Sequence, residues 1–379
     1  MQQTIYYRDD SLGFLDENRP LADKLAALHQ TVAARCPCIH RIAIALYDAR
    51  TDLLKTYIYS SEGESPLRHY QAPLASSHTL SEIVAQGKPR VVNDLTIFAD
   101  SAHEHSRRLL AGGFGASYTL PMYQNGMFRG FVFFNSRERG VLTEAVLHEL
   151  DLFGHLLALT AIYELQKMQN LADAINTARD ITRHRDNETG SHLDRMSRYS
   201  RLIALHLAEK YNLDDNFIEH IFMFAPLHDI GKIAIPDNIL LKEAKLTPEE
   251  FEVMKTHTRK GREVIDTMLG HFRLHDLEHG HMLRNIAELH HEALDGSGYP
   301  YGLKNEDIPI EARIVAVADI FDALTSRRPY KEAWSNAEAL EALRCMSGHI
   351  LDADCVAALT DNIEQVERIQ AEFKEDTFG

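Results

Sequence analysis

Residues 227–233 read LHDIGKI, and this short stretch decides how the rest of the chain is interpreted. It places the imidazole of His228, the carboxylate of Asp229 and the ammonium of Lys232 close together in an otherwise apolar run. Neutral imidazole and carboxylate are ligands shared by zinc, iron and manganese, whereas a lysine stays outside the metal shell and can bind or protonate a neighbouring anion. Because a single buried His–Asp pair is more often hydrogen-bonded than metal-bound, the other ligands must lie elsewhere.

Further candidate ligands occur upstream and downstream of this stretch. Glu188 and His192 are four residues apart, so a helix would place both on one face. Asp319 lies in the apolar run 313–321, where an unpaired buried charge would cost several kcal/mol and therefore needs a cation. One metal ion takes about four to six ligands, so the whole set implies at least two ions, with a carboxylate such as Asp229 bridging them. The candidates are Glu188, His192, His228, Asp229, His257, His290, His291 and Asp319.

Residues 290–300 read HHEALDGSGYP and follow the HDIGK sequence of residues 228–232. Together these motifs resemble the HD-GYP family, a branch of the HD metal-dependent phosphohydrolases that hydrolyses cyclic di-GMP. The resemblance extends from about residue 178 to the C-terminus, with no departure at the ligand positions. It implies an all-helical domain around two or three divalent metal ions, most often iron and alternatively manganese. It also allows a third ion beside His192 through Glu188.

The expected reaction follows from these ligands. A water between two metal ions is acidified enough to attack a phosphodiester at neutral pH, and the ions stabilise charge on the phosphorus oxygens. Asp229 and Lys232 are the expected catalytic residues, with Lys232 neutralising the scissile phosphate or protonating the leaving 3′ oxygen. Arg328 and Lys331, which follow the Asp319 segment, are expected to bind substrate phosphates. By resemblance, Tyr299 contacts the substrate, although a turn at 295–298 also explains that loop structurally.

Three functions compete for this set of residues. The first is a phosphodiesterase that converts cyclic di-GMP to pGpG, GMP or both, with cyclic GMP-AMP as an alternative substrate. The second is a catalytically weak module that binds metal and nucleotide for signalling, and the third is a hydrolase of another phosphoester. The complete ligand set with Lys232 favours the first over the second, and the GYP sequence at 298–300 favours it over the third.

Bulk composition indicates a globular protein of two domains. The chain has 379 residues with 45% hydrophobic content, and we find no apolar run near the roughly 18 residues that span a bilayer. The first ten residues are polar, and four cysteines in a chain of this length suggest reduced thiols. We therefore expect a soluble, cytoplasmic protein. A net charge of −16 argues against nucleic acid as a partner but permits a small dianion held by metals and a few basic side chains.

Residues 21–140 predict a domain of mixed α and β structure. Residues 21–34 have helical spacing of leucines, and residues 42–46 alternate as a strand. Asn125 and Gly126 separate two apolar runs, which is the strongest short signal of a β-hairpin. Together with residues 79–94 this pattern resembles a GAF sensory domain, with an antiparallel sheet flanked by helices. Such a domain is open to an unknown small ligand.

Residues 141–183 predict a long helix that joins the two domains. The segment has no proline and a single glycine, and its apolar residues recur at heptad spacing. We expect this stripe to pair with its copy in a homodimer, and the alternative is a helix packed on its own domain. The stripe consists of Leu147, Leu150, Leu157, Ala161, Met168, Leu171, Ile175 and Ala178. The expected organisation is thus an N-terminal segment (1–20), a GAF-like domain (21–140), this helix (141–183) and an all-α HD-GYP domain (184–379).

Two other segments rich in potential ligands are interpreted structurally. Cys36 and Cys38 lack the second half of a zinc site, so we expect ordinary thiols. Residues 271–281 contain four histidines among charged residues, and we expect a solvated segment or a lid near the site. Asp322, three residues after Asp319, is expected to orient a ligand or cap a helix.

Overall fold

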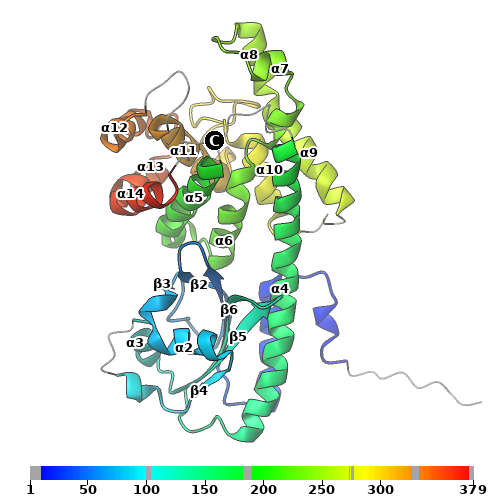
Figure 1. The fold of residues 1–379 in the computed structure, drawn as a ribbon, viewed down its shortest axis with the longest axis vertical. Helices are drawn as coiled ribbons and strands as arrows, with labels where there is room; N and C mark the ends of the chain where they lie inside the picture. The colour runs from blue at the N-terminus through cyan, green and yellow to red at the C-terminus, as the bar shows by residue number, and fades with distance from the viewer. Residues whose placement is uncertain are drawn as a thin grey trace, which may run out of the picture. The chain divides into compact units, whose positions relative to one another are not determined.

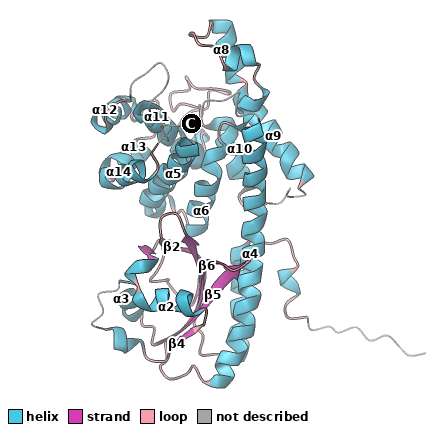
Figure 2. Ribbon diagram, in the orientation of Figure 1, coloured by secondary structure: helices cyan, strands magenta, loops and turns pink. Residues whose placement is uncertain are grey.

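The computed structural model describes residues 10–99, 104–181, 190–272, 274, 277–326 and 333–374. The chain divides into two compact units, Met1–Gln166 and Lys167–Gly379 (Figure 1). Every strand that the structure describes belongs to the first unit, and the second unit is built from helices (Figure 2). The expected combination of an α+β domain and an all-α domain is therefore confirmed.

The first unit is organised around one antiparallel sheet. Its six strands follow the order β3-β2-β1-β6-β5-β4. The expected hairpin is confirmed, since Asn125 and Gly126 connect β5 to β6 with φ angles of 50° and 78°, the left-handed values that a two-residue turn needs. The strands are β1 (Arg41–Asp48), β2 (Leu53–Ser61), β3 (Gln71–Pro73), β4 (Arg90–Val92), β5 (Ala116–Gln124) and β6 (Met127–Ser136).

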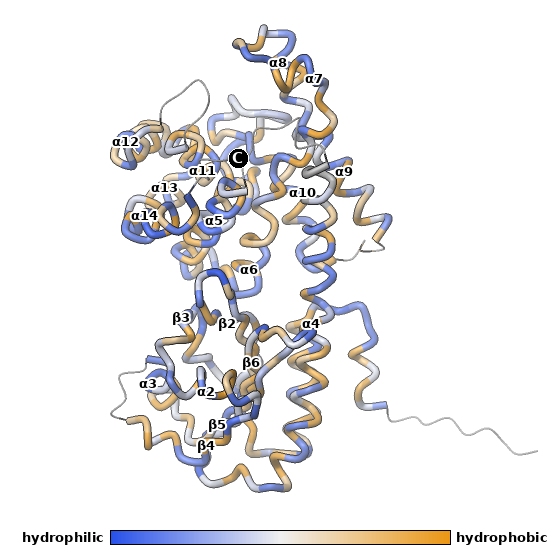
Figure 3. Tube along the Cα trace, in the orientation of Figure 1, coloured by the Kyte–Doolittle hydropathy of each residue, from blue (hydrophilic) through white to orange (hydrophobic). Residues whose placement is uncertain are grey.

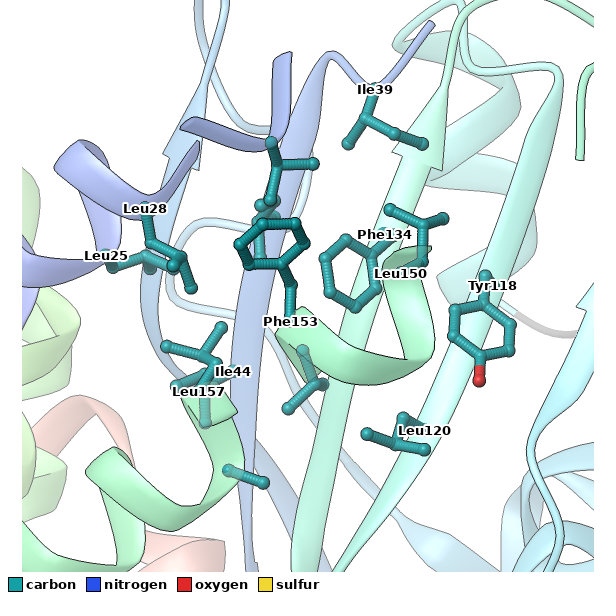
Figure 4. Packing of buried hydrophobic residues seen from close by; sticks show 14 of the residues in the cluster. Leu25, Leu28, Ile39, Ile44, Tyr118, Leu120, Phe134, Leu150, Phe153 and Leu157 are labelled. Atoms are coloured by element: carbon teal, nitrogen blue, oxygen red, sulfur yellow. The ribbon is translucent and has the colours of Figure 1, made fainter. Parts of the chain in front are cut away.

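Helices cover both faces of this sheet. On one face, α1 (Leu21–Arg35) and α4 (Glu144–Ile181) contribute leucines and Phe153 to a core with Ile44 and Phe134 (Figure 4). On the other face lie α2 (His78–Gln86) and α3 (Glu104–Ala111). Each fully buried leucine or phenylalanine contributes about 1.5–3 kcal/mol, so these two layers fix the sheet between them.

The heptad stripe of α4 packs on its own domain as far as Ala161. Leu150, Leu157 and Ala161 are fully buried in the core that α4 shares with the sheet. The expectation that this part of the stripe faces a second copy of the chain is wrong, because the sheet offers the same helix face an intrachain partner. The side chains of Ile175 and Ala178 lie outside the described residues. A different face of α4 exposes large hydrophobic side chains, namely Leu152, Leu159 and Tyr163, each more than 60% exposed.

Part of α4 is long and apolar enough to cross a membrane by length and composition. The span Glu144–Ala174 has a window of mean hydropathy 1.4, of which 33% is buried within the protein (Figure 3). The expectation that no segment approaches this limit is therefore wrong for α4. The same test is passed by core helices of soluble proteins, and α4 supplies Leu150 and Leu157 to the core of its own unit.

The second unit is a set of helices, and the longest connection between described α-helices runs from the end of α10 at Leu289 to the start of α11 at Ile310. A capping box begins α8, with Thr247 and Glu250 hydrogen-bonded to each other's backbone N–H. Near the C-terminus, Asp352 caps α13 through the N–H groups of Asp354 and Cys355. The helices are α5 (Gly190–Tyr211), α6 (Asp215–Phe224), α7 (Asp237–Leu240), α8 (Pro248–Lys255), α9 (His257–His271), α10 (Gly280–Leu289), α11 (Ile310–Thr325), α12 (Asn336–Met346), α13 (Ala353–Asp361) and α14 (Ile363–Glu372).

Candidate metal centre

His228 and Asp229 lie on a tight segment between two 3₁₀ turns, Ala225–Leu227 and Ile230–Ala234. The helix α6 ends at Phe224. Pro226 explains this end, because a proline has no N–H group to continue the helical hydrogen bonds. Asp229 has φ −97° and ψ 14°, a sparsely populated backbone region where many active-site residues are found.

Gly231 allows α9 to approach this segment at backbone contact. A Cβ atom at Gly231 would lie 1.8 Å from the carbonyl oxygen of His257 and 2.4 Å from the backbone nitrogen of Gly261. Any other residue would push α9 away. The glycine of the HDIGK sequence therefore brings His257, at the start of α9, close to Asp229.

Seven of the eight candidate ligands gather in two groups whose donor atoms lie within 4.8 Å of one another. One group contains Asp229, His257, His290 and His291, and the other contains His192, His228 and Asp319. The eighth candidate, Glu188, lies outside the described residues. The grouping joins residues from five separate segments of the sequence, which agrees with the expectation of two ion positions.

Asp229 lies between the two groups. Its Oδ1 is 3.2 Å from Nε2 of His257 and 3.7 Å from Nε2 of His290. Its Oδ2 is 3.2 Å from Nε2 of His228 and 2.7 Å from the ammonium nitrogen of Lys232. Each oxygen thus faces a different ligand group, which is the geometry required of a carboxylate that bridges two ions.

The unsatisfied atoms of the site fit divalent cations. Nδ1 of His228, His257 and His290 lies 2.8–2.9 Å from a backbone carbonyl oxygen, which can only accept, so each Nδ1 carries the proton. The Nε2 atom of each ring therefore has a free lone pair. Nε2 of His257 and of His290, and Oδ1 of Asp229, are buried without a hydrogen-bond partner. Leaving such atoms unpaired costs about 1–3 kcal/mol each, and a divalent cation would satisfy them together.

Protonation states agree with ligation. Burial and neighbouring imidazoles lower the pKa of His290 and His291, so both rings are neutral at pH 7. Burial alone would raise the pKa of Asp229, but the charge of Lys232 and the imidazole of His228 hold it well below its usual value. The site therefore offers neutral imidazoles and an ionised carboxylate, the forms that bind Fe²⁺, Mn²⁺ or Zn²⁺.

A buried ion pair orients His192. Oδ2 of Asp322 lies 2.7 Å from Nδ1 of His192, and Asp322 also accepts two hydrogen bonds from Arg195, at 2.5 and 2.9 Å. Burial would raise the pKa of Asp322, but hydrogen bonds from Arg195 and His192 lower it. The carboxylate fixes the orientation of the imidazole through Nδ1, as the sequence suggested for Asp322. Arg195 was not anticipated, although it lies three residues after His192, on the same helix face.

The loop after His291 is held over the ligands by Glu292. The buried carboxylate of Glu292 accepts hydrogen bonds from the backbone N–H of Tyr301 at 2.7 Å and of Leu303 at 2.9 Å. The Tyr299 ring lies 4.8 Å from the ring of His291, centroid to centroid. Burial and the charges of Asp229 and Asp319 raise the pKa of Tyr299. Its phenol is therefore protonated at neutral pH and lies within the electrostatic range of the metal centre. Glu292 was not predicted.

Three expectations about other residues have different outcomes. Arg328 and Lys331 lie outside the described residues, as does His275. Within the segment 271–281, His271 ends α9 and His279 precedes α10, whose opposite end leads to His290. A solvated segment or a lid near the site stays a prediction. Cys36 and Cys38 have raised thiol pKa values because of burial, and no metal-binding group of the described residues includes them.

The part of the sequence that holds the candidate ligands is similar to a known family. Residues 186–355 match the family model described as the HD domain. This part of the chain contains all eight candidate ligands, so the HD domain and the two ligand groups coincide. HD domain phosphohydrolases bind divalent metal ions, and the expectation of a divalent metal cofactor is confirmed at that level.

Several curated proteins share this HD domain. The cyclic di-GMP phosphodiesterase response regulator RpfG of Xanthomonas campestris is 46% identical over 210 residues, 55% of this chain and 51% of that protein. A cyclic di-GMP phosphodiesterase of Thermotoga maritima is 45% identical over 181 residues, 47% of this chain and 45% of that protein. The 3′3′-cGAMP-specific phosphodiesterase 2 of Vibrio cholerae is 34% identical over 262 residues, covering 64% and 47%. The chain spans about half the length of these relatives.

The first unit also has similar solved structures. The GAF domain of an Acinetobacter phosphoenolpyruvate-protein phosphotransferase is 14% identical, covers 40% of this chain and 87% of that chain, and gives a TM-score of 0.31.

Proposed function

We propose that this protein is a metal-dependent phosphodiesterase that hydrolyses cyclic di-GMP to pGpG, GMP or both. The observation that carries the proposal is the position of Asp229, whose two carboxylate oxygens face two separate ligand groups beside Lys232. The names of the relatives that share the HD domain support the substrate class. We propose that each chain binds two or three divalent ions. Iron is the first candidate metal and manganese the alternative, because imidazole and carboxylate ligands without thiolate suit both metals.

Bound between these ligands, two divalent ions supply an activated water and stabilise negative charge on the phosphate. The residues of the chain then divide the remaining work. Lys232 has a partly exposed ammonium 2.7 Å from Asp229, and we assign it to the scissile phosphate or to protonation of the leaving 3′ oxygen. Tyr299 is assigned to the substrate, on a loop that Glu292 holds in place. Arg328 and Lys331 remain proposed ligands of the second phosphate.

The test combines metal analysis with product analysis. Protein purified without oxygen should contain two or more iron or manganese ions per chain and should convert cyclic di-GMP to linear products. Replacing Glu188 with alanine should lower the metal content by about one ion if that residue holds a third. One ion per chain or fewer would contradict the two-ion site. Full metal content without turnover would instead favour a module that binds nucleotide for signalling.

Cyclic GMP-AMP is the second candidate substrate, because one relative is named as specific for it. Measuring kcat/KM for both cyclic dinucleotides on the same preparation decides between them. Arg328→Ala should raise KM for either cyclic dinucleotide by roughly 10- to 100-fold, since a charge-assisted hydrogen bond contributes about 1.5–3 kcal/mol. The linear substrate bis-p-nitrophenyl phosphate, which has no second phosphate, should be little affected.

A homodimer remains a proposal, and its interface is now assigned to the exposed face of α4. Leu152 and Leu159 are seven residues apart, and Tyr163 follows four residues later, so all three lie along one side of the helix. Replacing Leu159 with aspartate should convert a dimer to a monomer in light scattering, while Leu157→Ala should destabilise the unit through its core. An unchanged molecular mass would contradict this interface.

We also propose that the first unit binds a small anion on the sheet face beneath α2 and α3. Arg90 donates to hydroxyl oxygens of Thr79 and Thr119, its Nε is buried without a partner, and no described carboxylate is hydrogen-bonded to it. Burial lowers the pKa of Arg90 to about 10, so it is still charged at pH 7. Phosphate or succinate should raise the melting temperature of the protein but not that of Arg90→Gln. Equal shifts in both would contradict an anion site at Arg90.

A further inference from the structure

A second group of histidines lies in the second unit, away from the candidate metal centre. His220 is on α6, and His279 and His281 lie where α10 begins. The ring centroids of His220 and His279 are 4.5 Å apart, and those of His279 and His281 are 5.7 Å apart. His290 and His291 follow the opposite end of α10. The proposed reaction makes no use of this histidine group, although His279 and His281 belong to the histidine-rich segment of the sequence.

His220 has the same hydrogen-bond arrangement as the candidate ligands of the metal centre. Its Nδ1 lies 2.8 Å from the carbonyl oxygen of Asn216, four residues earlier, just as Nδ1 of His290 lies 2.8 Å from that of Ile286. In both rings the carbonyl must accept, so Nδ1 carries the proton and Nε2 has a free lone pair. His220 is fully buried, and its Nε2 has no hydrogen-bond partner.

His279 presents a second unsatisfied nitrogen beside the first. Its Nδ1 is buried and has no hydrogen-bond partner. Its backbone has φ 54° and ψ 21°, a left-handed conformation that a histidine adopts only at a cost. Residues held in such conformations cluster at ligand sites, where the surrounding structure maintains the strain. Here the strained backbone places the imidazole against His220.

The ring centroids of this group are as close together as those of neighbouring imidazoles in the metal centre, although the three residues do not offer nitrogens that all lie within 4.8 Å of one another. In the metal centre, neighbouring imidazoles have centroid separations of 4.1 Å for His290–His291 and 5.8 Å for His192–His228. The separations of 4.5 and 5.7 Å in the second group lie between these values. His281 is exposed on the first turn of α10, so its side chain is free to change rotamer toward the other two rings.

The charges around the group also favour a cation. Burial lowers the pKa of His279, and the nearby carboxylate of Asp214 acts in the opposite direction, which favours positive charge. Burial, followed by the neighbouring His279, lowers the pKa of His220 to about 3. His220 is therefore a neutral imidazole at pH 7, the form that binds a metal ion, and it cannot satisfy its own Nε2 by taking up a proton.

We propose that His220 and His279, completed by His281 and water, bind a divalent transition metal of the zinc class at a site separate from the catalytic centre. Imidazole ligands suit Zn²⁺, and two or three of them with water complete a tetrahedral shell. The two helices that carry the ligands both lead to the catalytic centre. α6 continues through a 3₁₀ turn to His228, and α10 ends beside His290. Metal at this site would therefore stabilise the two elements that position those ligands.

The decisive variant is His279→Gly, because glycine accepts a φ of 54° without strain. It removes a proposed ligand while relieving the backbone, so loss of metal cannot be attributed to failure to fold. The matched control is His206→Gln, which replaces an exposed histidine on α5. Both variants are made in the full-length protein and again in an Asp229→Ala background, where the catalytic centre is impaired.

Each protein is dialysed against buffered Zn²⁺ at low micromolar free concentration and its bound zinc is measured. We expect His279→Gly to bind one ion fewer than wild-type and His206→Gln to bind the same number, in both backgrounds. Co²⁺ should give the visible absorption of a tetrahedral site in the Asp229→Ala protein, and His220→Gln should abolish it. Equal zinc content in His279→Gly and wild-type would overturn the proposal, as would binding by all variants only at millimolar zinc. These measurements are independent of turnover, so they stand whether or not the proposed phosphodiesterase activity is found.

Discussion

His290 in the second unit is a buried imidazole and His105 in the first unit is a partly buried one, and in each ring the Nε2 atom is buried without a hydrogen-bond partner. Their surroundings have opposite charge. Nε2 of His290 lies 3.7 Å from the carboxylate of Asp229. His105 instead lies near the guanidinium groups of Arg90 and Arg41. Burial, and then these two positive charges, lower the pKa of His105 to about 3. A buried imidazole nitrogen therefore does not define a metal site by itself. The charge of its neighbours decides whether the site attracts a cation or an anion.

We expect the largest loss of metal and of activity when the negative charge of Asp229 is removed. Asp229→Asn keeps the size of the side chain but removes the negative charge that faces both ligand groups. We expect metal content to fall at both positions and phosphodiesterase activity to fall by at least about 10³-fold. Elemental analysis and turnover of cyclic di-GMP are the measurements, with the exposed Asp307→Asn as control. Retention of both ions would show that Asp229 does not bridge.

A smaller loss of activity is expected when the charges of the site are kept and the position of α9 changes. Gly231→Ala would place a Cβ atom 1.8 Å from the carbonyl oxygen of His257, so α9 must shift. A displacement of about 1 Å in a catalytic group can cost roughly 10²-fold in rate, and we expect a loss of that order. Gly190→Ala is the control, because its Cβ would have no neighbour within 4 Å. Normal activity in Gly231→Ala would mean that the close approach of α9 is not required.

A smaller effect still is expected when only the charge that orients the His192 imidazole is removed. Asp322→Asn keeps a side-chain oxygen near His192 but removes the charge that orients the ring and pairs with Arg195. Loss of such a partner typically costs 10- to 100-fold in metal affinity, and we expect about that loss at the position beside His192. Asp354→Asn, which breaks a surface pair with Lys210, should leave metal affinity unchanged. Competition with a chelator measures both variants.

The smallest effect concerns the cationic surroundings of His105. Its pKa is about 3 in the folded protein and about 6.5 when unfolded, so below pH 6.5 the unfolded chain binds a proton that the folded chain does not. Stability of the N-terminal unit should therefore fall as the pH is lowered from 7 to 5.5, with His105 contributing roughly 1 kcal/mol of that loss. His105→Gln should reduce the pH dependence by this amount in urea unfolding. An unchanged slope would indicate that His105 is protonated in the folded state.

The sequence predicted the ligands better than their supports. His228, Asp229 and Asp319 carry a chemical signature, because a carboxylate in an apolar run demands a cation. Arg195 and Glu292 carry no such signature, since each is an ordinary charged residue until the fold brings it to Asp322 or to the backbone of the 296–303 loop. The stripe on α4 was found correctly as an apolar face, but spacing cannot tell whether a sheet of the same chain or a second copy covers it.

Glu292 holds the 296–303 loop in position through the backbone of the loop and not through its side chains. It follows the ligand His291 directly, yet its own contacts are with the backbone N–H groups of Tyr301 and Leu303, so it grips the loop through atoms that every loop sequence possesses. For protein engineering, this means that residues of the 296–303 segment other than Gly296, Gly298 and Gly302 can be exchanged, since these three glycines have positive φ angles or approach the backbone too closely for a Cβ atom. The side chains of the other residues can be rewritten to recognise a different cyclic dinucleotide while the anchoring carboxylate and the metal ligands stay as they are.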